Sequence, residues 1–251
     1  MDQRPVQSPL LTNNPHNGII LTGGVIQLLI GPEKHSFLVH ESVLRKSSTF
    51  FRNRLKEEWR RKKANKPHEI INLPHEKKDV VELYLQWLYS EQSIHYIRTS
   101  PADDRRDPSR LHDAREFRLL YGLYCFANMV QDRHAKNATI KGFIDRIIIS
   151  KSFPSDLAES LVTDGLESSP LWRLLVDMYA YFGSRDCVPI ATHGQPRDWN
   201  HAPVQFWKDV LEVTWKMHAS CNHSQYCPWE EDPKWYYERT EDDQVASSGR
   251  G

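Results

Sequence analysis

Hydrophobic and polar positions along this chain alternate in short blocks at first and recur at helical spacing later. Residues 25–30 are mostly apolar and rich in β-forming side chains, residues 31–33 contain Gly and Pro, and residues 36–39 form a second apolar block. A connection this short predicts a hairpin of two strands. Residues 69–74 contain a further short apolar block, which predicts a third strand.

Serine hydroxyls stand ahead of two short apolar sets directly after the second strand. The serines are Ser42, Ser47 and Ser48, and the two sets are Val43 with Leu44, then Phe50, Phe51 and Leu55. A serine at the start of a helix accepts a hydrogen bond from one of the first helical amides. We therefore predict two short helices after the hairpin.

Apolar residues then recur every three to four positions, as in helices with one buried side. The stretches are residues 78–90, 114–130, 132–150, 157–162, 171–182 and 203–217. In the last helix we expect a core-facing side made of Phe206, Trp207, Val210, Leu211 and Met217. The predicted fold class is α+β, a small three-stranded sheet capped by a helical cluster and followed by an α-helical extension.

Polar stretches without periodic hydrophobicity divide the chain. We expect a disordered lead-in at residues 1–21, a mobile insertion at about residues 95–113, and a disordered tail at residues 239–251. The structured part then consists of residues 22–150, which hold the sheet, and residues 151–238, the helical extension.

Composition and charge narrow the classes of function. The chain has 251 residues with 33 Lys or Arg and 33 Asp or Glu, so no net charge draws it to nucleic acid or to an acidic membrane. Four cysteines are too few and too scattered for a disulfide framework. No signal-peptide segment is evident, and no apolar run approaches the roughly 20 residues of a membrane span. We therefore expect an intracellular protein, cytoplasmic or nuclear, without a membrane partner.

Four short motifs follow one another along the predicted sheet and helices. They are His40-Glu41-Ser42-Val43-Leu44, Ser47-Ser48-Thr49-Phe50-Phe51, Ile71-Asn72-Leu73 and Tyr84-Leu85-Gln86-Trp87-Leu88-Tyr89. In this order and at these spacings they resemble a BTB/POZ domain, most of all the divergent fungal branch of that family. The resemblance covers residues 22–150, and the helical tail resembles the extension that follows many fungal BTB domains. It implies a scaffold or adaptor that contacts other proteins, and no enzymatic activity.

Two features depart from the family pattern. No amphipathic helix precedes the first strand, whereas BTB domains that exchange N-terminal segments carry one there. Val25 stands where many relatives have an Asp that lines a charged pocket. The domain-swapped dimer and recognition through that pocket are therefore not carried over, and the question of a homodimer stays open.

The resemblance also implies an alternative function, that of a substrate adaptor of a cullin-3 ubiquitin ligase. Such adaptors use an apolar-x-Glu motif and the helix after the third strand. Leu55-Lys56-Glu57 has this form but lies a few residues early, since the aligned position is closer to Trp59. No Kelch, MATH or zinc-finger module is evident that would hold a substrate, so we rank this function below a general interaction module. The expected partner-binding residues are Leu55, Glu57, Trp59, Tyr84 and Trp87.

One group of side chains has metal-ligating chemistry: His218, Cys221, His223 and Cys227. Zinc sites usually combine two paired half-sites separated by a connecting loop. Here all four side chains lie within ten residues, which strains a single tetrahedral shell. We therefore favour ordinary loop residues over a zinc site or a redox-active cysteine pair, and we expect no cofactor.

No arrangement typical of a catalytic site is evident. The chain lacks a Gly-rich phosphate loop, a nucleophile elbow and a His-Glu-x-x-His pair. We expect His40 to hydrogen-bond the strand-to-helix turn and Cys125 to be a satisfied core thiol.

One short basic patch, residues 60–66 beside Trp59, meets the minimum requirement for nucleic-acid binding. Balanced net charge and the lack of a second patch argue against a nucleic-acid partner. Within this patch, residues 60–63 fit either a nuclear import signal or, as we favour, solvated cations at a helix end.

Overall fold

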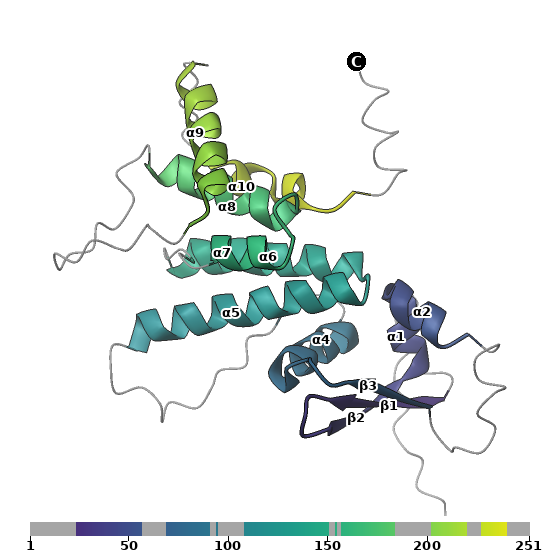
Figure 1. The fold of residues 1–251 in the computed structure, drawn as a ribbon. Helices are drawn as coiled ribbons and strands as arrows, with labels where there is room; N and C mark the ends of the chain where they lie inside the picture. Colours follow the sequence, from purple (N-terminus) through teal and green to yellow (C-terminus); the bar gives the residue numbers. More distant parts are fainter. Residues whose placement is uncertain are drawn as a thin grey trace, which may run out of the picture.

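The computed structural model of the chain describes residues 24–56, 69–90, 94, 108–150, 154, 157–183, 202–219 and 227–239. A three-stranded sheet lies at one end of the molecule, and helices are stacked over it (Figure 1). The chain is therefore α+β with a small sheet and mostly helices, as predicted. The expected lead-in at residues 1–21 lies outside the described residues, as does the expected tail apart from residue 239.

The sheet contains the three predicted strands, β1 (Val25–Ile30), β2 (His35–His40) and β3 (Glu69–Leu73). β1 lies in the centre, antiparallel to β2 and parallel to β3. Residues alternate in burial along β1, because successive side chains of a strand point to opposite faces of its sheet. The buried set, which includes Leu28, faces the helices, whereas the other face of the sheet is partly open and carries Leu38, 66% exposed.

Two short helices follow β2 directly, α1 (Glu41–Ser47) and α2 (Thr49–Arg54). Ser48 begins α2 as predicted, since its Oγ accepts a hydrogen bond from the amide of Phe51 at 3.1 Å. α4 (Lys78–Ser90) then covers the buried face of the sheet. These elements confirm the predicted order of strand, strand, helix, helix, strand and helix.

α5 (Pro108–Met129) and α6 (Arg133–Ser150) lie side by side in the middle of the molecule (Figure 1). Both helices were predicted, but α5 begins at Pro108, whereas the insertion was expected to extend to residue 113. Proline fits the first turn of a helix, where the backbone amide has no partner within the helix. A polar, proline-containing stretch can therefore begin a helix. The predicted insertion extended past residue 108, where α5 begins.

The extension consists of helices packed on α5 and α6. They are α7 (Leu157–Thr163), α8 (Pro170–Gly183), α9 (Val204–Ala219), α10 (Pro228–Glu231) and the short 3-10 helix η4 (Pro233–Tyr236). α7, α8 and α9 were predicted, whereas α10 and η4 were not. In Figure 1, α8 and α9 form the layer farthest from the sheet. Among the described residues, none of the helices combines the length and the apolar character needed to cross a bilayer.

Two hydrophobic cores meet at α5 and α6. Leu123 and Phe126 of α5 belong to the core under the sheet, whereas Leu120 and Tyr124 of the same helix belong to the core of the extension. The expected boundary at residue 150 therefore does not separate two independent cores. The extension is packed against the same helix pair that covers the sheet-side helices.

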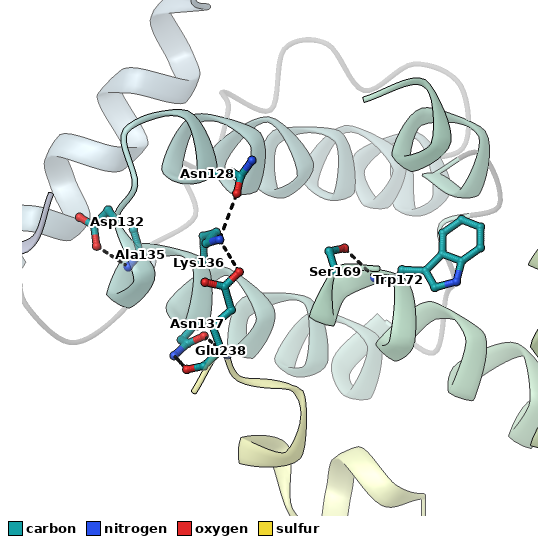
Figure 2. A network of polar contacts seen from close by, with 8 residues as sticks. All are labelled: Asn128, Asp132, Ala135, Lys136, Asn137, Ser169, Trp172 and Glu238. Atoms are coloured by element: carbon teal, nitrogen blue, oxygen red, sulfur yellow. Dashed lines mark hydrogen bonds and ion pairs between the residues drawn. The ribbon is translucent and has the colours of Figure 1, made fainter. Parts of the chain in front are cut away.

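Asp132, at the turn between α5 and α6, joins this helix pair to the sheet-side helices. Its carboxylate is fully buried and accepts hydrogen bonds from Ser47 Oγ at 2.5 Å and from the Tyr84 hydroxyl at 2.8 Å. Its second oxygen accepts from the amide of Ala135 at 3.0 Å and so caps α6 (Figure 2). A buried carboxylate is tolerated only with such donors, because water is not there to solvate it.

Figure 2 also shows how the C-terminal segment is held on α6. Lys136 forms an ion pair with the Glu238 carboxylate and donates a hydrogen bond to Asn128 Oδ1 at 3.0 Å. The Asn137 side chain bonds the backbone of Glu238 twice, donating at 3.2 Å and accepting at 2.8 Å. These contacts fix the end of the extension against the centre of the molecule.

Replacing Asp132 with Ala tests the role of this junction. The change removes the acceptor of three hydrogen bonds, and we expect the free energy of unfolding to fall by about 3 kcal/mol, because an orphaned buried donor costs about 1–3 kcal/mol and a lost helix cap about 1 kcal/mol. Urea denaturation measures the change. Tyr84→Phe is the matched control, since it leaves Asp132 with two donors, and it should cost about 1 kcal/mol. Equal losses in the two variants would contradict the account.

Candidate interaction surface on helix α9

α9 is anchored by Phe206, which is fully buried on the side of the helix that faces α8. The Phe206 ring meets Trp172 and Tyr179 edge to face, with centroid distances of 5.3 and 5.1 Å. Val210, one turn further along, is buried in the same core. Aromatic contacts of this geometry add to the free energy gained from burial, so this side of α9 is firmly packed.

A polar contact fixes the rotation of α9 about its own axis. The indole Nε1 of Trp172 on α8 donates a hydrogen bond to Asp209 Oδ2 at 2.8 Å, and Gln205 donates to the other oxygen at 2.7 Å. Trp172 is buried, so its N–H requires an acceptor within the protein. The side chains on the opposite side of α9 are therefore held in fixed positions.

That opposite side carries three large apolar residues. Val204 is 72% exposed, Leu211 67% and Trp215 78%. Their spacing of seven and four positions places them on one face of a helix. We call these three residues the outer face of α9. The helix crosses α8 and rises beyond it at the edge of the molecule (Figure 1).

Leu211 was predicted to face the core, and that prediction is wrong. It follows Val210 by one position, which turns its side chain by about 100° around the helix, away from the buried side. α9 carries apolar residues on two faces, and the sequence pattern alone does not say which face meets α8. The spacing of Val204, Leu211 and Trp215 places them on one helix face. This spacing indicates an exposed face only once the buried side of α9 is known.

Charged residues border the outer face. Lys208 and Glu212 are exposed beside it, and Glu212 forms an ion pair with Lys216 at 2.6 Å within the helix. Protein interfaces commonly combine an apolar centre with a polar rim. The outer face of α9 has this composition on a small scale.

A shallow pocket of about 250 Å³ lies between α8 and α9, on the other side of α9. Trp172 and Val176 line it together with the carboxyl groups of Asp177 and Asp209. Small-molecule sites are usually enclosed cavities of about 300–1,000 Å³. The volume of this open pocket is below that range. In addition, the carboxyl groups of Asp209 and Asp177 already accept hydrogen bonds from protein donors.

Three of the five expected partner-binding residues lie among the described residues. Leu55 and Tyr84 are fully buried in the core under the sheet, so their side chains offer nothing to a partner in this conformation. Trp87 is partly buried and packs against the same core. These side chains are covered because α2 and α4 direct them toward the core under the sheet. The local sequence motifs did not indicate this orientation. Glu57 and Trp59 lie outside the described residues, as does the basic patch at residues 60–66.

The four metal-ligand candidates are only partly described. His218 is exposed near the end of α9, and Cys227 is buried at the start of α10. Cys221 and His223 lie outside the described residues. Within the described part of the chain, no group of three or more His, Cys, Asp or Glu side chains is placed to hold a metal ion.

His40 differs from its expected role. Its ring Nδ1 lies 2.9 Å from the hydroxyl of Tyr89 at the end of α4, and its backbone amide donates to the same hydroxyl at 3.1 Å. It makes no side-chain bond to the first amides of α1. His40 therefore ties β2 to α4 instead of bracing the strand-to-helix turn.

Cys125 is only partly buried, although a core thiol was expected. Its Sγ lies 3.7 Å from Asp164 Oδ2, which also accepts a hydrogen bond from the Tyr121 hydroxyl at 2.5 Å. Burial is the main reason that the pKa of the Cys125 thiol rises to about 11. The thiol is therefore protonated at neutral pH, and a reactive thiolate is not favoured there.

Comparison with known protein families and with curated proteins finds no match to this chain.

Alanine variants of α9 test which side of the helix is packed. Phe206→Ala should lower the free energy of unfolding by about 3 kcal/mol, because it opens a cavity in the core. Leu211→Ala and Trp215→Ala should each change it by less than about 0.5 kcal/mol, since both side chains are exposed. Thermal and urea denaturation measure the three variants. A loss at Trp215 as large as that at Phe206 would show that the outer face is covered.

The pH dependence of stability tests the packing of the C-terminal segment on α8. Burial raises the pKa of the Asp177 carboxyl above 3.8. The hydrogen bond from Tyr236 and the charge of Arg173 lower the pKa, but burial has the larger effect. The folded chain therefore keeps this proton to higher pH than the unfolded chain does, and the stability it contributes is lost as pH rises from 3.8 through the raised pKa.

Asp177→Asn removes this titration but keeps an acceptor for Tyr236. The free energy of unfolding of the wild type minus that of the variant should therefore fall as the pH rises from 3.8 through the raised pKa of Asp177. Urea denaturation over this pH range measures it. A difference that is constant or rises with pH would show that burial does not govern this carboxyl.

Proposed function

We propose that this chain is a protein–protein interaction module, in which a BTB/POZ-type unit at residues 22–150 supports a helical extension that carries the contact surface. The outer face of α9 is the observation that carries this proposal. Three large apolar side chains are exposed to solvent on this face, and Phe206 anchors the other side of the helix.

The energetics of the outer face favour a partner. Burying a large apolar side chain gains about 1.5–3 kcal/mol relative to leaving it exposed. Clustered apolar residues on a soluble protein commonly mark a contact site, and tryptophan is the residue type most often responsible for binding energy at such sites. Because α9 is already held by α8, little conformational entropy would be lost when a partner binds.

The order of elements supports the BTB/POZ part of the proposal. Two antiparallel strands, two short helices, a third strand parallel to the first and a longer helix occur in the sequence order that the resemblance implies. The cullin-3 alternative has less support. Leu55, the apolar residue of its motif, lies in the core under the sheet.

A pair of matched variants tests the proposal. Leu211→Glu places a charge on the outer face of α9, whereas Leu38→Glu makes the same change at a leucine of equal exposure on the open face of the sheet, 66% against 67%. The immobilised wild-type chain and both variants are used to capture proteins from extract of the source cell, and bound proteins are quantified by mass spectrometry.

We expect Leu211→Glu to reduce the captured partner at least tenfold, since a charge in a desolvated apolar contact is costly. Leu38→Glu should leave the amount unchanged. Equal capture by all three proteins, or a loss only in Leu38→Glu, would show that α9 is not the contact surface.

A further inference from the structure

The outer face of α9 is complementary to itself, and we propose that it pairs in antiparallel orientation with the outer face of α9 in a second copy of the chain. This inference rests on the proposed function, because it uses the same surface, and it names the occupant. The pairing is isologous, so every contact made by one copy is repeated by the other.

The three apolar residues are spaced along α9 so that they match in an antiparallel pair. Consider a two-fold axis level with Val210, midway along the contact. Trp215 lies five positions after this level and Val204 six positions before it. In an antiparallel pair, Trp215 of one copy therefore lies within one position of Val204 of the other, an offset of about 1.5 Å. The Trp215 indole then packs on the smaller side chain of Val204 at both ends of the contact.

Leu211 completes the apolar contact in the middle. It lies one position beyond the axis, so the Leu211 side chains of the two copies lie side by side, separated along the helices by about 3 Å. All three exposed apolar residues of each copy are then buried by the pairing. Large residues packed on small ones along a helix pair resemble the interdigitated packing of antiparallel helices in bundles.

Charge complementarity also favours the antiparallel pairing. Lys208 lies two positions before the axis and Glu212 two positions after it, and both lie on the same flank of the outer face, about 40° and 80° around the helix from Val204. A two-fold axis brings the same flank of both helices together. Lys208 of each copy therefore lies opposite Glu212 of the other, which gives two ion pairs that bridge the copies.

The size of the contact sets its strength. One pair of 16-residue helices buries less than the roughly 800 Å² per partner of a standard interface. We therefore expect a concentration-dependent dimer with a dissociation constant of about 10 μM or weaker. A stronger partner of other chemistry would compete for the same face.

The charge pair provides a test that apolar variants alone do not. Lys208→Glu sets two carboxylates against each other at each end, and Glu212→Lys sets two ammonium groups against each other. Each single variant should weaken the dimer at least fivefold, and the double variant K208E/E212K should restore it, because the ion pair is reversed. Circular dichroism confirms that α9 keeps its helix content, since Glu212 also bonds Lys216.

The decisive step is to mix the two single variants. A Lys208→Glu chain and a Glu212→Lys chain are complementary to each other at both ends, so the mixture should form heterodimers that neither variant forms alone. Sedimentation equilibrium of the full chain, from low micromolar to several hundred micromolar protein, measures association. Leu211→Glu disrupts the apolar part of the contact, so this variant should be monomeric throughout. Leu38→Glu is its control.

Three results overturn the proposal: a wild-type chain that stays monomeric, a dimer that Leu211→Glu does not weaken, or charge variants that do not recover when mixed. The first two also separate this inference from the proposed function. If the wild type is monomeric while Leu211→Glu still abolishes capture of another protein, self-pairing is wrong and the contact surface stands. If Leu211→Glu alters neither property, both are wrong.

Discussion

The burial of α5 on two sides is the constraint on which the rest of this structure depends. One side of the helix, with Leu123 and Phe126, closes the core under the sheet, while the other, with Leu120 and Tyr124, forms part of the extension's core. A helix that is apolar on both sides is unstable when only one of them is covered. The sheet unit and the extension therefore form one packed body, and Asp132 fixes the angle at which the helix pair leaves the sheet-side helices.

The position of α9 follows from this arrangement. α8 packs into the core that α5 and α6 provide, and Trp172 and Phe206 then hold α9 against α8. Because each step is a buried contact, the outer face of α9 is presented on a rigid support. A surface of this kind can bind with little loss of conformational freedom, which is what an interaction module requires. The same rigidity makes self-pairing in one register possible, since the spacing of Val204, Leu211 and Trp215 is fixed.

Much of the fold could be predicted from local sequence, whereas most of the candidate site could not. Alternation predicted the three strands, helical periodicity predicted the long helices, and Ser48 marked the start of α2, because each signal lies within a few residues. The contacts of Asp132 join residues 85 and 48 positions apart, and no local pattern encodes them. Leu211 was assigned to the wrong side of α9 because a helix with two apolar faces has no unique inner side until its neighbour is known. Leu55 and Tyr84 were expected at a contact surface because of the family resemblance, and no local pattern shows that both side chains are buried.

Covalent labelling of tryptophan side chains in solution tests the central claim, that α9 is anchored on one side and open on the other, most directly. The account predicts fast labelling of Trp215, 78% exposed, and slow labelling of Trp172 and Trp229, 4% and 1% exposed, in dilute protein. Trp215 should become protected as the protein concentration rises, while the two buried residues stay unchanged. Protection of Trp215 in the dilute chain, or labelling of Trp172 at the same rate, would contradict the account.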